Sequence, residues 1–337
     1  LKNGIVALVV RDAGAKSGLY PLSDPEDMPS GLGAEVQAYI TRAFLGGDGK
    51  PQKVLLSLIG SSDDVVNAGC AALASSDFDY LALPAEVEAE QMTAAVTWLE
   101  GARKKYCIGK LVLPNHKADN PAAVNFVATG IKAGGQTYEA GDYCSRIAGV
   151  LEGTPINSSA TATPLPEVSG VDEIADPNAA ADNGQLILIH DGRKVKLGRA
   201  VNSLTTVSGD MSESLRKIKI VEALDLIRSQ CRGVIEDKYI RMANSYDNKM
   251  LLVSEIHAFL QELESEGVIQ AGSSFVEINL VKQKQWLKEH GVDVSGLSDQ
   301  EILKADTGSW VFLRMGGAVL DAMEDFDLDY YMGGEGA

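Results

Sequence analysis

The sequence predicts an α/β protein of two domains. We expect an N-terminal α/β domain over 1–135 with a largely parallel sheet, a C-terminal α+β domain over 136–332, and a tail at 333–337. Short apolar runs alternate with helical patterns in the first half, as in sheets covered by helices. A segment rich in Ser, Thr, Ala, Pro and Asp at 154–184 then breaks these patterns. The length of 337 residues fits about two domains.

Four short apolar runs rich in β-branched residues are predicted to be buried strands of the first domain. They lie at 4–10, 53–59, 80–83 and 110–113, with helical patterns near 33–45, 62–76 and 87–105. Pro84 and Pro114 lie at or just after strand ends, as expected where a strand passes into a loop.

The middle of the chain predicts a helix, a loop and a hairpin. The helix covers 139–153, with Tyr143 and Ile147 on one stripe, and Thr154-Pro155 ends it. We expect 154–184 to be a long, irregular and exposed loop. Asp191-Gly192 joins strand-like runs at 186–190 and 194–197, which is a strong hairpin signal.

The last third is mostly helical. Helices are predicted at 211–231, 234–243 and 248–265, with Gly267 at a C-cap position. A strand at 275–279 and a helix at 280–290 follow, and Ser298 with Glu301 forms a capping-box pattern for a helix at 298–304. Another strand-like run covers 310–315. In the final run, apolar residues alternate with aspartates, which predicts a half-exposed strand.

Charge and cysteine content exclude several classes of partner. The formal net charge of −17 disfavours nucleic acid and anionic lipid surfaces, both of which need Lys and Arg. No apolar run reaches the roughly 20 residues that span a bilayer, so we expect no membrane contact. The four cysteines form no CxxC pair, and we expect buried free thiols in a reducing cytoplasm, with a disulfide still allowed.

No pattern indicates a catalytic, cofactor or metal site. Gly46-Gly47-Asp48-Gly49-Lys50 is followed by Pro51, which breaks a phosphate-loop pattern, and Gly31-Leu32-Gly33 lacks its third glycine. The four histidines are far apart in the sequence, and no nucleophile elbow is present. We therefore expect no cofactor and no enzymatic activity.

Several segments in the second half carry a family resemblance. Residues 140–149 read AGDYCSRIAG and 153–161 read GTPINSSAT. Together they resemble the part of contractile phage tail sheath proteins in which an SRIAG helix leads into a GTP loop. The run GRAVNSLTT at 198–206 is similar to that family's ARGVNSLT, with Ala200 where glycine is common. Weaker similarities lie at 218–227, 244–249 and 320–325. The loose match of the first 130 residues is to the variant from prophages and phage-like particles of Gram-positive bacteria.

The resemblance implies a structural function. Sheath subunits polymerise around an inner tail tube, bind baseplate and terminator proteins, and assemble in the host cytoplasm into the tail of a virion or phage-like particle. Their extended arms add strands to neighbouring subunits, a form of β-augmentation. Here the C-terminal arm would be 319–332, and its inter-subunit residues would be Leu320, Met323, Phe326, Leu328 and Tyr330.

The beginning of the chain bears on assembly. The first residue is Leu1, and a strand-like run follows almost at once. We therefore expect that an upstream segment was removed or lies outside this numbering. In the family an N-terminal arm precedes the first strand, and its absence here would affect assembly.

The helix at 280–290 is a candidate for contact with the inner tube. It carries Lys282, Lys284 and Lys288 beside Trp286. An ordinary amphipathic surface helix explains the same pattern.

Two other functions remain open from the sequence. An α/β enzyme of unidentified activity fits the alternating first half, and a retained cofactor or measured turnover would favour it. A secreted adhesion module would require export of the chain.

Overall fold

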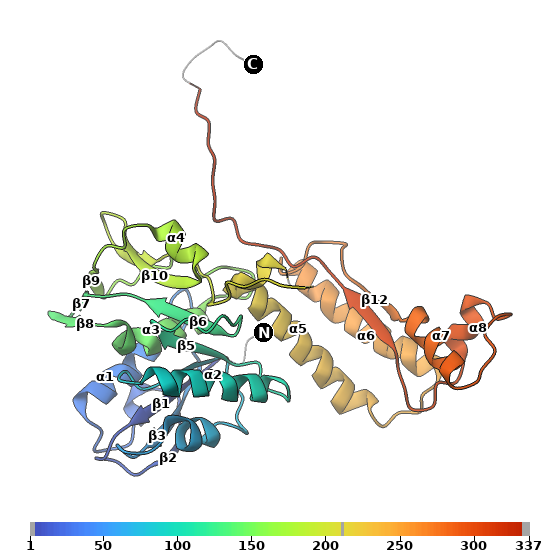
Figure 1. Ribbon diagram of the computed structural model, residues 1–337, viewed down its shortest axis with the longest axis horizontal. Coiled ribbons are helices and arrows are strands. Elements are labelled where there is room, and N and C mark those ends of the chain that lie inside the picture. The colour runs from blue at the N-terminus through green and yellow to red at the C-terminus, as the bar shows by residue number, and fades with distance from the viewer. Residues whose placement is uncertain (1–3, 210–211, 332–337) are drawn as a thin grey trace.

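The computed structural model describes residues 4–209 and 212–331. It has two lobes, a body built on a large sheet and an elongated lobe of helices (Figure 1). The C-terminal segment leaves the molecule near the junction of the two lobes. The predicted tail at 333–337 and the last arm residue, Met332, lie outside the described residues.

The body contains an eight-stranded sheet in the order β11-β10-β6-β5-β4-β1-β3-β2. The six inner strands are parallel, and the two edge strands β2 and β11 are antiparallel, which confirms the predicted sheet type. The strands are β1 (Ile5–Arg11), β2 (Gly18–Leu22), β3 (Lys53–Ile59), β4 (Tyr80–Ala82), β5 (Lys110–Pro114), β6 (Ala123–Val127), β10 (Gln185–His190) and β11 (Val195–Leu197).

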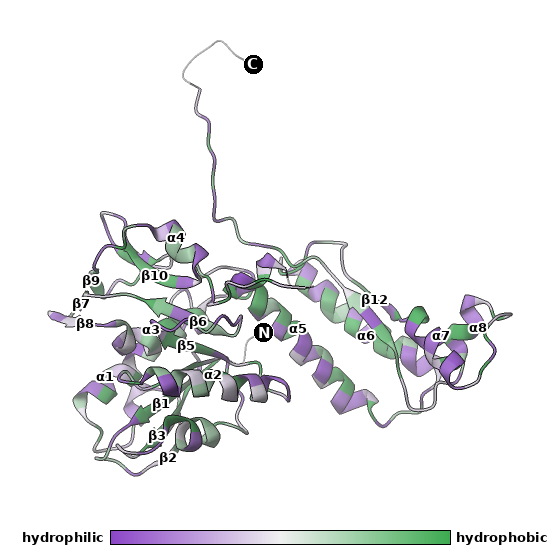
Figure 2. Cartoon of the chain, in the orientation of Figure 1, coloured by the Kyte–Doolittle hydropathy of each residue, from purple (hydrophilic) through white to green (hydrophobic). Residues whose placement is uncertain are grey.

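Helices cover both faces of this sheet, so its inner strands are apolar on both sides. On one face lie α1 (Ala34–Ala43) and α3 (Ala140–Gly153), and on the other lie η2 (Val65–Cys70) and α2 (Ala89–Arg103). Figure 2 shows the apolar colour along β5, β6 and β10. In place of the helix predicted near 62–76, the structure has the shorter π-helix η2.

The predicted helix at 139–153 is α3, and it is the most buried helix of the body. It packs against α1, where the Ser145 hydroxyl donates a hydrogen bond of 2.7 Å to the Tyr39 carbonyl. Arg146 is also buried, and it pairs with Glu167 at 2.6 Å. The SRIAG segment thus serves to pack two helices together.

The expectation of an exposed, irregular loop at 154–184 was only partly right, because parts of the segment are ordered and buried. The segment contains β9 (Val168–Gly170), which pairs with β7 (Ile131–Ala133) beside β8 (Gln136–Tyr138), and the helix α4 (Pro177–Asp182). Leu165 is fully buried. Residues 162–165 pair with β11, since the amide of Leu165 donates to Val195 and that of Leu197 to Thr163, both at 2.9 Å. Scattered apolar residues among Ser, Thr and Pro hold this segment on the body.

The change from sheet body to helical lobe comes later than the boundary that we predicted between 135 and 136. The helix α3 and the strands β10 and β11 belong to the same core as β1. The change follows β11, where η3 (Glu213–Arg216) leads into α5 (Ile218–Val234). The prediction ended the first domain where the alternating strand and helix patterns stop, but the same sheet continues with β10 and β11.

The second lobe is built on the helix pair α5 and α6 (Tyr246–Ser265), joined through η4 (Ile235–Tyr239). The two-stranded sheet of β12 (Phe275–Ile278) and β13 (Leu313–Gly316) packs beside it. The far end is formed by α7 (Leu280–Glu289) and α8 (Asp299–Lys304), and α8 begins with the predicted capping box of Ser298 and Glu301. Gly267 follows α6 with a φ of +73°, as expected for a C-cap glycine.

Buried charges join α5 to the sheet body. Asp225 of α5 pairs with Arg103 at 2.6 Å and with Lys110 at 3.2 Å, and its side chain is almost fully buried. Beside it, the Tyr80 hydroxyl donates a hydrogen bond to Glu222. Across the described ranges, every helix is too short or too polar to cross a bilayer.

Candidate functional site

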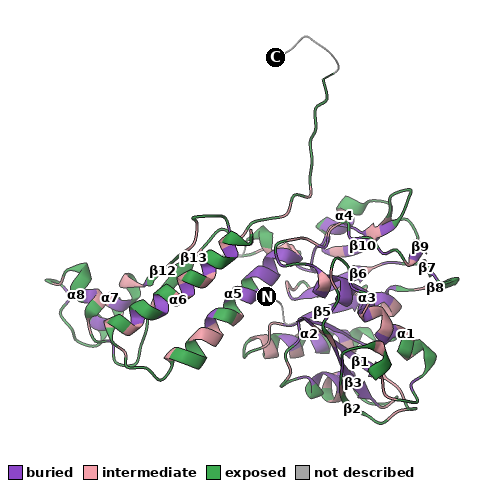
Figure 3. Ribbon diagram, turned by 180° about the vertical axis from the view of Figure 1, so that it is seen from behind, coloured by how far each residue is buried: buried purple, intermediate pink, exposed green. Residues whose placement is uncertain are grey.

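The C-terminal arm, residues 319–331, begins against the two lobes, and its outer part extends away from both of them (Figure 1). Among residues 4–209 and 212–331 it forms no strand, apart from one isolated bridge between Val319 and Ile269. The predicted alternation at 326–330 therefore lies in extended backbone without a partner strand in this subunit. Seen from behind, the outer part of this segment, residues 325–331, is exposed (Figure 3).

The predicted inter-subunit residues differ in their exposure. Met323, Phe326, Leu328 and Tyr330 are between 80% and 88% exposed, whereas Leu320 is 37% exposed. Leu320 lies where the arm still follows the lobe, because its amide donates to the Val268 carbonyl at 2.9 Å. The other four side chains are unusual for a soluble subunit, since large apolar groups in a cluster mark interaction sites.

The arm root, residues 321–325, is held by charges from the body. Lys217 pairs with Asp321 at 2.6 Å and with Glu324 at 3.4 Å, and Arg199 pairs with Asp325. The side chain of Glu324 is only 5% exposed.

Two hydroxyl groups complete the surroundings of Glu324. Ser159 and Thr161 donate to the same carboxylate oxygen, at 2.9 and 2.5 Å. The other oxygen is the one that faces Lys217. Residues from two separate segments of the body, 159–161 and Lys217, therefore converge on one carboxylate of the arm.

The contacts of the arm root shift the pKa values of Lys217, Asp321 and Arg199. Partial burial opposes a charged form, but the contacts with Asp321 and Glu324 raise the pKa of Lys217 above its ordinary value. Burial likewise opposes ionisation of Asp321, and its hydrogen bond from Lys217 still lowers the pKa of that carboxyl. The hydrogen bond to Asp325 raises the pKa of Arg199. Lys217, Asp321 and Arg199 are therefore charged at neutral pH.

Sequence reasoning did not find this root contact. Ser159, Thr161 and Arg199 lie in the segments that carried the resemblance, but no pattern connected them with the arm. Nothing in the sequence distinguished Lys217 or Glu324 from other surface charges. The one available signal was that Ser159, Thr161 and Arg199 lie in motifs for which the sequence indicated no function.

The four candidate tube-facing residues on α7 do not form one surface. Lys282 and Lys288 are exposed, whereas Lys284 and Trp286 are partly buried. At about 100° per residue, Lys282 points away from Lys284 and Lys288. The Trp286 ring stacks on His290, with 3.8 Å between ring centroids.

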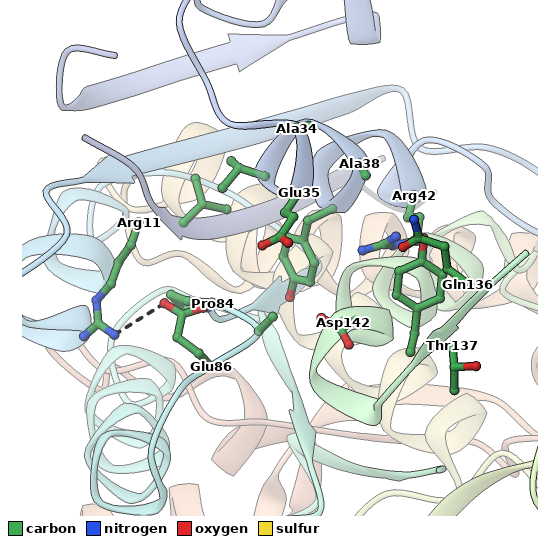
Figure 4. A pocket seen from close by; sticks show the side chains of 15 residues that line it. Arg11, Ala34, Glu35, Ala38, Arg42, Pro84, Glu86, Gln136, Thr137 and Asp142 are labelled. Carbon is green, nitrogen blue, oxygen red and sulfur yellow. Dashed lines mark ion pairs between the residues drawn. The ribbon is translucent and has the colours of Figure 1, made fainter. Parts of the chain in front are cut away.

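The body also contains a crevice of about 500 Å³ at the carboxyl ends of β1 and β4 (Figure 4). The chain runs from β1 to β3 on one side and returns to β4 on the other, which is where doubly wound sheets bind ligands. Three carboxylates, from Glu35, Glu86 and Asp142, outnumber the two cations Arg11 and Arg42 in its lining. Arg11 is paired with Glu86 at 3.6 Å, so an anionic ligand would find little free positive charge.

The glycine-rich turn at 46–50 has a packing function. Gly49 donates its amide to the Gly153 carbonyl at 2.8 Å, and a Cβ on Gly49 would lie 2.8 Å from that oxygen. Gly46 has a φ of +64° and accepts a hydrogen bond from Arg146. Within residues 4–209 and 212–331, no three His, Cys, Asp or Glu side chains are grouped as a metal site would need.

Comparison with known proteins identifies the family. No protein-family model matches the chain. The tail sheath protein of the Clostridium phage phiCD119 is 35% identical over 344 residues, covering 98% of this chain and 94% of that protein.

Solved structures share the fold. The sheath tail protein Lin1278 from Listeria innocua has a TM-score of 0.69 and 15% identity, covering 94% of this chain and 95% of its own. The PVC sheath complex of an extracellular contractile injection system, in its contracted state, has a TM-score of 0.67 and 10% identity. The match covers 97% of this chain and 91% of that one. The chain therefore belongs to the tail sheath proteins, which are structural subunits of phage tails and not enzymes.

Proposed function

We propose that this subunit polymerises around an inner tail tube by giving its C-terminal arm to a neighbouring copy as an added strand. The observation that carries the proposal is the set of four large apolar side chains, 80% to 88% exposed, on an extended segment. Backbone hydrogen bonds would tie the copies together, and the alternating side chains would select the correct partner surface.

The two-stranded sheet of β12 and β13 is our proposed acceptor. A sheet of two strands is only marginally stable alone, and its outer edges offer unpaired backbone groups. Beside β13 lies an apolar groove of about 390 Å³ whose lining includes Ile240, Met242 and Val311. These three side chains are 67%, 45% and 40% exposed, so burying them under an arm would be favourable.

The charges of the arm suit this acceptor. Three aspartates, Asp325, Asp327 and Asp329, alternate with the apolar residues. Two exposed cations lie in the segment that borders the groove; Lys238 already pairs with Glu255, so Arg241 is the cation that would face the aspartates. Aspartates on the other face of the arm would also hinder uncontrolled pairing of free arms.

Truncation tests the proposal. A chain ending at Asp325 should unfold at the same temperature as the full chain but form no sheath polymer in electron micrographs. A chain ending at Tyr331 is the matched control, and it should polymerise like the full chain. Polymers of normal appearance from the chain ending at Asp325 would exclude arm exchange.

A photo-crosslinking residue locates the acceptor. Placed at Leu328, it should react with a second copy at 240–242 or 309–313. A crosslink confined to the same copy, or to another lobe, would contradict the proposed acceptor.

We further propose that contraction moves the lobes as rigid bodies while the exchanged strands stay paired, in a particle that also binds baseplate and terminator proteins. The energy would be stored in the extended lattice at assembly, behind a kinetic barrier. The same Leu328 crosslink should then form in extended and in contracted sheaths. A crosslink found in only one of the two states would contradict this mechanism.

The tube contact that we propose is the face of α7 that carries Lys284 and Lys288. The double replacement Lys284→Glu with Lys288→Glu should weaken sedimentation of the sheath with tubes. Lys282→Glu, on the other side of the helix, is the control with the same type of charge change. Unchanged binding with all three lysines replaced would exclude α7 as the contact.

A further inference from the structure

The arm root differs from the rest of the arm in its contacts. Residues 321–325 contact three parts of the body: the loop with Ser159 and Thr161, the segment at Arg199, and Lys217 before α5. By contrast, residues 326–331 make no hydrogen bond or ion pair with any described residue. The arm thus changes from held to free between Asp325 and Phe326.

We infer that these groups form a clamp, centred on Glu324, that places the hinge of the arm after Asp325 and can release it to give a longer arm. The clamped arm has six free described residues, 326–331, which span about 20 Å at roughly 3.3 Å per residue. Release would add the five residues 321–325, or about 16 Å. The subunit would then have two reaches for the same strand.

The chemistry favours Glu324 as the centre of the clamp. The Asp321 and Asp325 side chains are 50% and 75% exposed, and exposed ion pairs contribute little. Glu324 is nearly buried, and its carboxylate takes two hydroxyl hydrogen bonds and faces an ammonium group. Hydrogen bonds to a charged group are about twice as strong as neutral ones. Loss of this one charge should therefore open the clamp.

The charges around Glu324 favour release of the arm once its ion pairs are lost. Lys219 on α5 also lies near Asp321 and Glu324, and burial lowers its pKa. Among the described residues, the ion pairs with these two carboxylates come from Lys217. On the arm, three carboxylates lie within five residues and repel one another once their cations are lost. The clamp therefore depends on Lys217 and Arg199 together with the two hydroxyls.

A two-reach arm deepens the proposed strand exchange and rests on it for its use in the polymer. A neighbour that moves during contraction could keep its strand while the donor releases 321–325. The clamp itself is a property of the single subunit, and it can be tested without any polymer.

Spin labels test the clamp. In unpolymerised full-length protein with Cys107 replaced by alanine, a label is attached at Met323→Cys, in the clamp, or at Leu328→Cys, beyond the hinge. Room-temperature spectra should show a slow component for the first label and fast motion for the second. Glu324→Gln should lower the ratio of slow to fast motion at Met323 about tenfold, the effect of one charge-assisted hydrogen bond.

Two further variants complete the test. Lys217→Met removes the cation on the body side of the clamp and should have the same effect on the Met323 label. This variant keeps the test decisive if Glu324→Gln folds poorly. Asp327→Asn removes one charge beyond the hinge and should leave the label at Met323 unchanged. Equal mobility of both labels in the native sequence, or no response to Glu324→Gln and Lys217→Met, would overturn the inference. If the truncation experiment excluded arm exchange, the expected spectra would not change, because the clamp is a property of the single subunit.

Discussion

Replacing Gly149 by alanine tests how α3 is held in the body. A Cβ at this position would lie 2.1 Å from the carbonyl oxygen of Ala43 in α1, whereas real Cβ contacts essentially never fall below 3.0 Å. The obstacle is backbone, so no rotamer change can relieve it. The two helices must separate by about an ångström, and the hydrogen bond of 2.7 Å from Ser145 to Tyr39 spans the same interface.

The expected cost follows from two opposing effects. Alanine favours a helix over glycine by about 0.5–1 kcal/mol. Forcing extra volume into a packed interior costs about 1–3 kcal/mol, and a strained hydrogen bond adds about 1 kcal/mol. We therefore expect Gly149→Ala to lower the free energy of unfolding by about 1–3 kcal/mol.

Gly101→Ala is the matched control, because Gly101 also lies inside a helix and nothing lies within 4 Å of its added Cβ. It should raise the free energy of unfolding by about 0.5–1 kcal/mol. Urea unfolding followed by circular dichroism measures both variants. If Gly149→Ala proved as stable as Gly101→Ala, the close approach of α1 and α3 would be refuted.

Three other changes have clear expected outcomes. Asp225→Asn leaves two largely buried cations without their carboxylate and should lower the free energy of unfolding by about 3–5 kcal/mol in urea titrations. Leu165→Ala should lower it by about 2–5 kcal/mol, because the side chain is fully buried. Hydrogen bonds from Ser274 and the Gly272 amide lower the pKa of Glu264 to about 2. This carboxylate thus stabilises the fold above its ordinary pKa of about 4.3, and the contribution is lost as the pH falls towards 2.

Each of these outcomes has a contrary result. A loss below 1 kcal/mol for Asp225→Asn would mean that water reaches the cations. If Leu165→Ala left the free energy of unfolding unchanged, Leu165 would be exposed, as the composition of the segment predicted. For Glu264, a carboxyl titration midpoint near 4 by NMR would show that the hydrogen bonds do not persist in solution.

The strands that the sequence predicted well are the fully buried ones. β1 and β3 are uninterrupted apolar runs with both faces covered, so local composition and tertiary environment agree. The edge strand β2 was missed because it is mostly exposed and contains Pro21, which is unfavourable in a strand interior. β6 was missed because the buried Asn125 interrupts its apolar run.

Composition is a poor guide to structure where only a few apolar residues pack a segment against the core. The segment at 154–184 is mostly polar, but a few apolar residues, among them Ile156, Leu165 and Val168, are buried and hold it on the body. The arm root was hidden for a related reason, since Glu324 and Lys217 are far apart in the sequence and ordinary in type. Long-range pairing of this kind depends on the fold, and no local pattern reports it.

Both borders of the large sheet are closed to further strands. On one side Pro21, inside β2, has no amide hydrogen to offer to an incoming chain. On the other side residues 162–165, including Pro164, already pair with β11. In a particle that crowds many identical copies together, lateral fusion of sheets into fibres would be a constant hazard. With these borders blocked, the body can sit against its copies without merging with them.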